Sequence, residues 1–276
     1  MTARKPPEIA TLAVEQGELK ARQSWNKAFV AAFLGGAYIA FGGLLAITVS
    51  AGLDPARWGT LPTLFTGSVF TLGLVLVVIA GSQLATGNML LVPMGAMRGR
   101  LTLGEVGRNL TLVLVGNLVG AVFVAYFLAV QTGIVGGPGG EPAAPGTMIY
   151  ERLAGIAETK ALGESPWQVF LRGVGCNWLV CLAVWLALAG ESIADKILAI
   201  FFPIMAFVAM GFDHVVANMF FLPAAIFAGV PGVGWGVTLV NWVFAGLGNL
   251  VGAVIFVATS YWYLYLRESP EEATAR

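Results

Sequence analysis

The chain has 276 residues, 58% of them hydrophobic and only 11% charged, and its formal net charge is zero. A water-soluble domain of this size needs roughly a quarter of its residues charged to cover its surface. The composition therefore excludes an ordinary soluble protein and predicts an all-α, multi-pass protein surrounded by a lipid bilayer. The absence of a basic excess argues against nucleic acid as a partner.

Residues 1–27 precede the first apolar stretch and mix basic, acidic and apolar residues. They contain no apolar core followed by small residues at a cleavage site, so no signal peptide is predicted. The composition of Glu8–Gln23 suits either an amphipathic helix on the membrane surface or a disordered tail.

Six membrane spans are predicted from runs that lack charge. Ala28–Ser50 is long enough to cross a bilayer once. Trp58–Met97 is too long for one straight helix and too short for two helices with a solvated turn, so we expect a single crossing interrupted in its middle. The later spans are Leu110–Gln131, Gly173–Gly190, Ile197–Ala228 and Val237–Leu266. Of these, the fifth span is also expected to be interrupted, because Asp213 and His214 lie within it.

Basic residues predict the orientation of these spans. With both termini inside, eleven of the 15 Lys and Arg residues face the cytoplasm and four face outside. The four are Arg57, Arg152, Lys160 and Arg172. We therefore divide the chain into a cytoplasmic segment (1–27), a membrane domain (28–266) and a cytoplasmic tail (267–276), with a Pro/Gly-rich outer loop from Gly133 to Gly146.

The membrane domain contains an internal repeat, about 28–131 and 168–266. Gly81, Asn88, Met89 and Pro93 recur 130 positions later as Gly211, Asn218, Met219 and Pro223, and Gly116–Val122 recurs letter for letter as Gly248–Val254. Spans one and four share a weaker echo, Phe33-Leu34-x-Gly36 against Phe170-Leu171-x-Gly173. Each half holds three spans, an odd number, so the second half is predicted to insert upside down. The Gly-x-x-x-Gly pairs in the identical runs predict close helix packing rather than a role in transport.

Polar residues concentrate where the second and fifth spans are interrupted, at Gly81–Asn88 and Gly211–Asn218. Backbone groups freed by such a break survive in a membrane only where protein or water surrounds them. Half-helices that start after each break direct their N-terminal N–H groups toward the middle of the bilayer. A small anion or a polar acid is the ligand that such a site suits best.

His214 is the only histidine of the chain. Because ionisable groups within a membrane are costly, a functional role is favoured over simple packing, and imidazole suits the donation of a hydrogen bond or a proton near neutral pH. The adjacent Asp213 needs a partner if it is buried, and topology favours Lys160 over Arg172; the alternative is a solvated rim position.

Thr86 can donate its hydroxyl to a substrate opposite His214 or bond back to its own helix. Asn88 and Asn218 are expected to cap the freed backbone more than to contact substrate. Cys176 and Cys181 lie five positions apart on one predicted helix and are interpreted as buried packing residues. With no nucleotide-binding loop, catalytic triad or metal cluster recognisable, we predict that the chain is not an enzyme and needs no cofactor or metal.

Taken together, these residues resemble the formate/nitrite transporter family, over about Trp25 to Arg267. The resemblance is carried by Gly173-x-x-x-Asn177-Trp178-Leu179-Val180-Cys181-Leu182-Ala183-Val184-Trp185, Asp195-Lys196, Gly211-Phe212-Asp213-His214-x-x-Ala217-Asn218-Met219 and Tyr261-Trp262-x-x-Tyr265-Leu266-Arg267. It implies an aquaporin-like fold, a homopentamer in the cell membrane with one pore per protomer, and transport of a small monovalent anion such as formate, nitrite or hydrosulfide.

The resemblance also implies roles for individual residues. Thr86 would face His214 across the pore, and Lys160 would be a vestibule lysine. The remaining pathway residues would be Asp213, Asn177, Asn218 and Asn249, with apolar constrictions at Phe70 and Phe207 toward one face and at Leu74 and Leu84 toward the other. Because a bare anion crosses apolar rings badly, it is expected to cross as the neutral acid, protonated by water or through His214.

The chain departs from the usual first motif of that family, an acidic residue followed by Leu-Phe-Thr, because it has Gln83-Leu84-Ala85-Thr86. Loss of the phenylalanine is expected to widen a constriction or shift it to Leu84, and the Ala-Thr-Gly-Asn-Met form favours formate over nitrite. Two other functions remain open. They are a neutral-solute channel of the aquaporin type, whose twin Asn-Pro-Ala motifs are missing here, and a membrane anchor that transports nothing.

Overall fold

The computed structural model describes residues 3–141 and 144–267, and within these ranges every element is helical. In chain order the helices are α1 (Pro6–Ala21), α2 (Trp25–Ser50), α3 (Pro55–Trp58), α4 (Leu61–Ile79), α5 (Ala85–Met97), α6 (Leu103–Phe123), α7 (Pro145–Glu158), α8 (Pro166–Ala189), α9 (Ile193–Ala209), α10 (Val215–Phe227), α11 (Trp235–Ala253) and α12 (Ser260–Tyr265). Three π-helical segments follow α6, α7 and α11, namely η1 (Val124–Val130), η2 (Thr159–Gly163) and η3 (Val254–Thr259).

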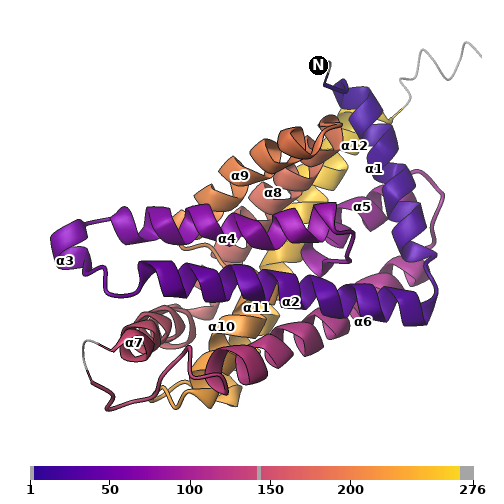
Figure 1. Cartoon of the computed structure of the whole chain (residues 1–276). Coiled ribbons are helices and arrows are strands. Elements are labelled where there is room, and N and C mark those ends of the chain that lie inside the picture. Colours follow the sequence, from indigo (N-terminus) through magenta and orange to yellow (C-terminus); the bar gives the residue numbers. More distant parts are fainter. Residues whose placement is uncertain (1–2, 142–143, 268–276) are drawn as a thin grey trace, which may run out of the picture.

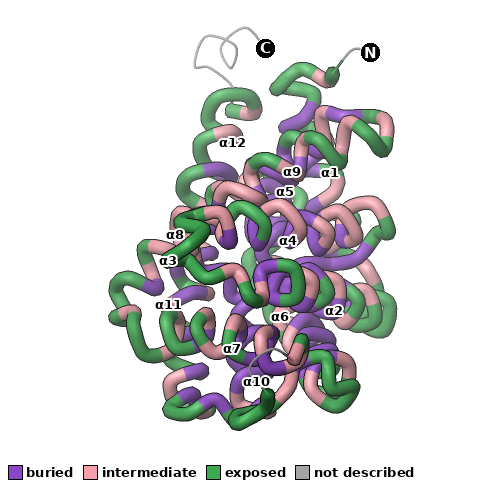
Figure 2. The backbone as a smooth tube through the Cα atoms, turned by 60° about the vertical axis from the view of Figure 1, so that its left-hand side comes forward, coloured by how far each residue is buried: buried purple, intermediate pink, exposed green. Residues whose placement is uncertain are grey.

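Five of the described helices, counted with their π-helical continuations, are long and apolar enough to cross a membrane. They are α2, α4, α6 with η1, α8, and α11 through α12. Leu198 and Phe202 of α9 are each 63% exposed, as outward-facing side chains are when lipid or another subunit covers them. Buried residues lie along the inner faces of the helices (Figure 2). The chain is thus a multi-pass membrane protein; the predicted tail lies outside the described residues from 268 onward.

The second and fifth apolar stretches are each divided into two helices. Helices α4 and α9 have 19 and 17 residues, whereas α5 and α10 have 13 each. The break at 80–84 lies close to the middle of Trp58–Met97, and the break at 210–214 contains Asp213 and His214, where the sequence predicted it. Their positions follow from Gly81 (φ +82°) and Gly211 (φ +72°), since glycine adopts positive φ without the steric cost of a side chain.

The helix ends define two ends of the molecule. Helices α1 and α12 lie together at one end of the molecule, which we call the α1 end (Figure 1). Helices α3 and α7 lie at the opposite end, which we call the α7 end. Helix α4 ends, and α5 begins, between these two ends, as α9 and α10 do. The two breaks thus bring polar backbone into the interior of the bundle.

Helix α1 packs against the bundle, so the disordered tail, one of the two alternatives that its composition left open, is wrong. Ile9, Ala13 and Val14 are buried in a cluster with α5 residues. A Cβ atom on Gly17 would lie only 2.0 Å from the Leu91 carbonyl oxygen, so this glycine permits the close approach of α1 to α5.

The identical glycine runs hold α6 against α2 and α11 against α8. A Cβ at Gly120 would lie 1.9 Å from the Phe33 carbonyl oxygen, and one at Gly252 would lie 2.3 Å from that of Val174. The predicted packing role of these glycines is confirmed.

The same contacts set the register between spans one and four. Phe33 corresponds to Val174, 141 positions later, whereas the sequence echo aligned Phe33 with Phe170. The echo was therefore wrong by four residues, about one helical turn. Apolar helices of biased composition match nearly as well one turn away, so sequence similarity alone could not set this register.

Candidate functional site

An asparagine of α6 fastens the break between α4 and α5. Asn117 Oδ1 accepts a hydrogen bond from Ala85 N at 2.8 Å, and Asn117 Nδ2 donates to Gln83 O at 2.9 Å and to Ala32 O at 2.7 Å. Asn117 is fully buried. One side chain thus satisfies two backbone groups of the break and ties them to α2, as buried backbone in a membrane requires.

Asn249 of α11 does the same at the other break. Its Oδ1 accepts from Val215 N at 2.9 Å, and its Nδ2 donates to Asp213 O at 2.7 Å and to Gly173 O at 2.9 Å. These three bonds assign Asn249 a positioning role. They also show that the expected backbone caps, Asn88 and Asn218, were wrong, since the amides of the third helix in each half satisfy the freed backbone.

Thr86 and His214 meet between the two breaks. Thr86 Oγ1 lies 2.8 Å from His214 Nε2. Both residues are buried, with exposed fractions of 0% for Thr86 and 2% for His214. The hydroxyl therefore faces the imidazole, as the family resemblance implied. Asn177 Nδ2 contacts the Thr86 carbonyl oxygen at 3.2 Å and the Asn249 carbonyl oxygen at 2.9 Å, so it supports the first turn of α5 from α8.

The backbone determines the tautomer of His214. Its Nδ1 accepts a hydrogen bond from Ala217 N at 3.1 Å, so His214 is itself the N-terminal cap of α10. In a neutral imidazole one nitrogen accepts and the other carries the proton. The proton therefore lies on Nε2, which donates to Thr86 Oγ1 and leaves the threonine hydroxyl hydrogen free for a further acceptor.

A cavity of about 260 Å³ opens on the α7-end side of this pair. Its wall includes His214, Lys160 and the rings of Phe70 and Phe207, whose centroids are 5.9 Å apart in an edge-to-face arrangement. Phe207 also stacks on the His214 ring at 5.9 Å. The aromatic rings thus lie beside the imidazole on this side.

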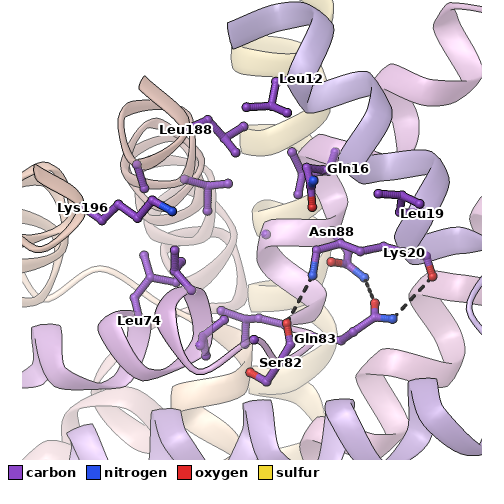
Figure 3. Close-up of a pocket in the computed structure, with 18 of the residues that line it drawn as sticks. Leu12, Gln16, Leu19, Lys20, Leu74, Ser82, Gln83, Asn88, Leu188 and Lys196 are labelled. Atoms are coloured by element: carbon purple, nitrogen blue, oxygen red, sulfur yellow. Dashed lines mark hydrogen bonds between the residues drawn. The ribbon is translucent and has the colours of Figure 1, made fainter. Parts of the chain in front are cut away.

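A second cavity, of about 480 Å³, lies on the α1-end side. Leu84 belongs to its wall. So do Leu74, Lys20 and Lys196, which Figure 3 labels. The four apolar residues expected at constrictions are therefore divided as predicted, with two on each side of the Thr86–His214 pair.

Behind the α7-end cavity lies a buried polar network, which we call the outer network. It consists of Lys160, Asp213, Asn218 and Asn241. Lys160 Nζ lies 2.8 Å from Asp213 Oδ1, and Asn218 Nδ2 donates to the same oxygen at 2.8 Å. The predicted pairing of Asp213 with Lys160 is confirmed, and the alternative of a solvated rim is wrong, because the Asp213 side chain is fully buried.

A corresponding inner network lies behind the α1-end cavity. It consists of Lys20, Gln83, Asn88 and Asn109. Asn88 Nδ2 donates to Gln83 Oε1 at 2.6 Å, and Lys20 Nζ donates to Ser82 O at 3.2 Å (Figure 3). Burial lowers the pKa of Lys20 from 10.5 to about 8.

Three members of these networks escaped sequence reasoning. Asn109 and Asn241 donate to the carbonyl oxygens of Lys20 at 3.1 Å and of Lys160 at 3.0 Å. The two asparagines lie 132 positions apart, the offset of the identical glycine runs, so the repeat contained the signal that would have found them. Lys20 had no such signal, because it lies before the first span.

No group of three His, Cys, Asp or Glu side chains placed to hold a metal ion occurs in residues 3–141 and 144–267. Cys176 and Cys181 are both buried and unpaired.

Comparison with known proteins agrees with this geometry. Residues 7–263 match the family described as "Formate/nitrite transporter". The chain is 48% identical to a probable formate transporter of Methanothermobacter thermautotrophicus, over 96% of this chain and 98% of that one. It is 40% identical to the formate channel BtFdhC of Bacillus thuringiensis, over 97% and 98% of the two chains. A solved structure titled "Pentameric formate channel with formate bound" is similar with a TM-score of 0.74 and 28% identity, over 88% of this chain and 98% of that one.

Proposed function

The chain belongs to the formate/nitrite transporter family, and from that premise we propose that it conducts formate across the cell membrane, with one pore in each subunit of a homopentamer. Nitrite and hydrosulfide, which are also small anions of weak acids, would be secondary substrates. The observation that carries the proposal is the Thr86–His214 contact at 2.8 Å, placed between two cavities that each have a lysine in their wall. Support for formate and for a pentamer comes from the names of the similar proteins.

In this proposal the α1 end faces the cytoplasm and the two halves are inverted repeats with broken second and fifth spans. The excess of basic residues on that side supports the orientation. The matching inner and outer networks, one at each break and on opposite sides of the bundle, support the inversion.

We call the α7-end cavity the outer cavity and the α1-end cavity the inner cavity. Substrate would pass from the outer cavity between Phe70 and Phe207, past the Thr86–His214 pair, and between Leu74 and Leu84 into the inner cavity. Burying an unpaired carboxylate among these rings is very costly, and desolvation raises the pKa of a weak acid. Formate would therefore cross as formic acid. The Nε2–H group of His214 and the Thr86 hydroxyl would replace part of its hydration.

Proton coupling through His214 belongs to the same proposal. A relay needs the ring to take up a second proton, and Nδ1 is occupied by the hydrogen bond from Ala217 N. The geometry thus favours a hydrogen-bond donor, with any relay requiring that bond to break first. If His214→Phe transports formate with the wild-type pH profile, the proton-relay role is wrong; if it also transports formate at the wild-type rate, the donor role is wrong as well.

The test is flux into proteoliposomes under gradients of formate, nitrite, hydrosulfide, acetate and chloride. Flux of formate that exceeds flux of nitrite, with little chloride flux, is expected. Water or glycerol flux without weak-acid flux would favour the aquaporin type. No flux of any solute by well-folded protein would favour the membrane anchor.

A further inference from the structure

A carboxyl group that the proposed pathway does not use lies beside Asp213. Glu164 is in the turn between η2 and α8, its side chain is only 3% exposed, and it belongs to the wall of the outer cavity. Its Oε1 accepts a hydrogen bond from Arg172 Nη1. Its Oε2 is buried and has no hydrogen-bond partner in the described structure. An unsatisfied buried carboxylate oxygen is expensive, so this atom calls for a partner.

Asp213 presents the matching half. Its Oδ1 accepts from Lys160 and Asn218, while its Oδ2 is buried and has no partner in the described structure. Arg172 links the two regions, because its Nη1 donates to Glu164 Oε1 and also lies 3.4 Å from the carbonyl oxygen of Gly211, two residues before Asp213. The Glu164 and Asp213 carboxyl groups are close enough for each to shift the pKa of the other. Two ionised carboxylates only accept and repel each other, whereas one added proton turns the pair into a donor and an acceptor.

We propose that Glu164 and Asp213 hold one proton between them at the outer mouth, and that this pair supplies the proton with which an anion enters the pore. The second half of this inference rests on the proposed function. The first half, that the pair is a proton-binding site, starts from the two buried carboxyl oxygens without partners and does not depend on the proposed function.

Charged and titratable groups face this pair from every element around it. Lys160 comes from η2, Arg172 from α8 and Arg152 from α7, and all three line the same cavity. Arg152 bonds to the hydroxyls of Ser50 and Thr66 and forms no ion pair within the described residues. His214 adjoins the cavity, and the buried Cys176 thiol lies nearby on α8.

These charges make the outer mouth respond to pH. Three cations face two carboxyl groups, so the net charge is +1 when both carboxyls are ionised and +2 when they share a proton. Burial and the neighbouring Asp213 raise the pKa of Glu164 from 4.5 to about 7, against the opposing effect of Lys160 and Arg172. The mouth therefore becomes more attractive to an anion, and holds a proton for it, as the outside pH falls through about 7.

The proton step balances simply. The shared proton passes from the Glu164–Asp213 pair to a carboxylate oxygen of the entering anion and forms the O–H bond of the neutral acid. The pair is left with both carboxyls ionised, and a proton from outside water restores it.

The first experiment measures the proton itself. Infrared spectroscopy of the reconstituted protein is expected to show the carbonyl stretch of a protonated carboxyl group that titrates with a midpoint near pH 7. Glu164→Gln removes this band, because the glutamine amide donates to Asp213 Oδ2 in place of the proton. The matched control Glu158→Gln, an exposed residue at the end of α7, retains it. Absence of the band from the wild-type protein, or its persistence in E164Q, overturns the proton site.

The second experiment measures delivery. With a midpoint near pH 7, the protonated fraction of the pair falls about tenfold between outside pH 6 and pH 8. Formate uptake by the wild type is expected to fall with it, by up to that factor beyond the change in formic acid concentration, and E164Q loses this extra dependence while E158Q keeps it. An identical pH profile for E164Q and wild type overturns the delivery role. If the wild type moves no formate at all, the proposed function fails, and the infrared titration still decides whether the pair binds a proton.

Discussion

The outer and inner networks share a geometry and differ in charge. In each network, one asparagine donates both to the residue two positions after the turn glycine and to a second asparagine. These bonds join Asn218 to Asp213 and Asn241 in the outer network, and Asn88 to Gln83 and Asn109 in the inner one. The residue two positions after the turn glycine is the acidic Asp213 in the outer network and the neutral Gln83 in the inner one. The hydrogen bonds of these asparagines are therefore the same whether that residue is charged or neutral. The side chain at this one position decides whether the lysine has a counter-ion.

The consequence is a difference between the two mouths of the proposed pore. Lys160 is paired with a carboxylate, whereas the Lys20 ammonium group has the Ser82 carbonyl oxygen as its one hydrogen-bond partner among the described residues, and burial lowers its pKa to about 8. The inner lysine therefore titrates near physiological pH. At the outer mouth the titrating group is the Glu164–Asp213 pair.

The largest expected effect on stability comes from removing the side-chain amide of Asn117 or Asn249, the residue that fastens the break in each half. Asn249→Ala leaves Val215 N and Asp213 O of the break buried without their partner and removes the bond to Gly173 O, and each unsatisfied group costs about 1–3 kcal/mol. Asn117→Ala is expected to lose as much. We expect severe loss of folded oligomer, measured by size-exclusion chromatography and thermal unfolding in detergent. The control Asn26→Ala, at an exposed position, is expected to behave as wild type. If only one of the two variants lost folded oligomer, the two asparagines would not have equivalent roles in the two halves.

The next effect concerns the counter-ion of Lys160. Asp213→Asn removes the carboxylate that forms the salt bridge with the ammonium group of Lys160, whose side chain is 12% exposed. Breaking a buried ion pair in this way costs about 3–5 kcal/mol. The melting temperature of D213N should fall well below that of the exposed control Asp54→Asn, and Lys160→Gln in the same chain should restore part of it. If D213N melts like wild type, the outer lysine tolerates isolation as the inner one does.

The smallest effect is expected from placing an aspartate at position 83 of the inner network, as the outer network has at position 213. Lys20 loses its charge as the pH at the α1 end rises through about 8, so its charged fraction falls by about tenfold between pH 7 and pH 9. Gln83→Asp places a carboxylate beside it, which raises the pKa of Lys20 and retains the charge. Beyond the change in formic acid concentration, we expect formate flux from that side to fall between these two pH values in wild type, by at most that factor, and to change little in Q83D. The variant Gln16→Asp adds the same charge elsewhere on the cavity wall, and an equal response in it would contradict a specific pairing.

Much of this site could be predicted from the sequence. Composition determined that the protein is multi-pass, because too few charges are present to cover it. The breaks were predicted from polar residues in apolar runs, since free backbone in a membrane needs such surroundings. The pairing of Lys160 with Asp213 followed from topology, and the contact between Thr86 and His214 from a motif that resembles a known family.

The tertiary structure alone decided which side chains complete the breaks and the mouths. Asn117 and Asn249 replace Asn88 and Asn218 as backbone caps, α1 brings Lys20 into the inner cavity, and Glu164 lies against Asp213. Each of these contacts joins segments distant in the chain across a helix interface, and its existence depends on helix register. Apolar sequence specifies register weakly, as the one-turn error between spans one and four shows, because small and aliphatic residues pack almost equally well one turn away.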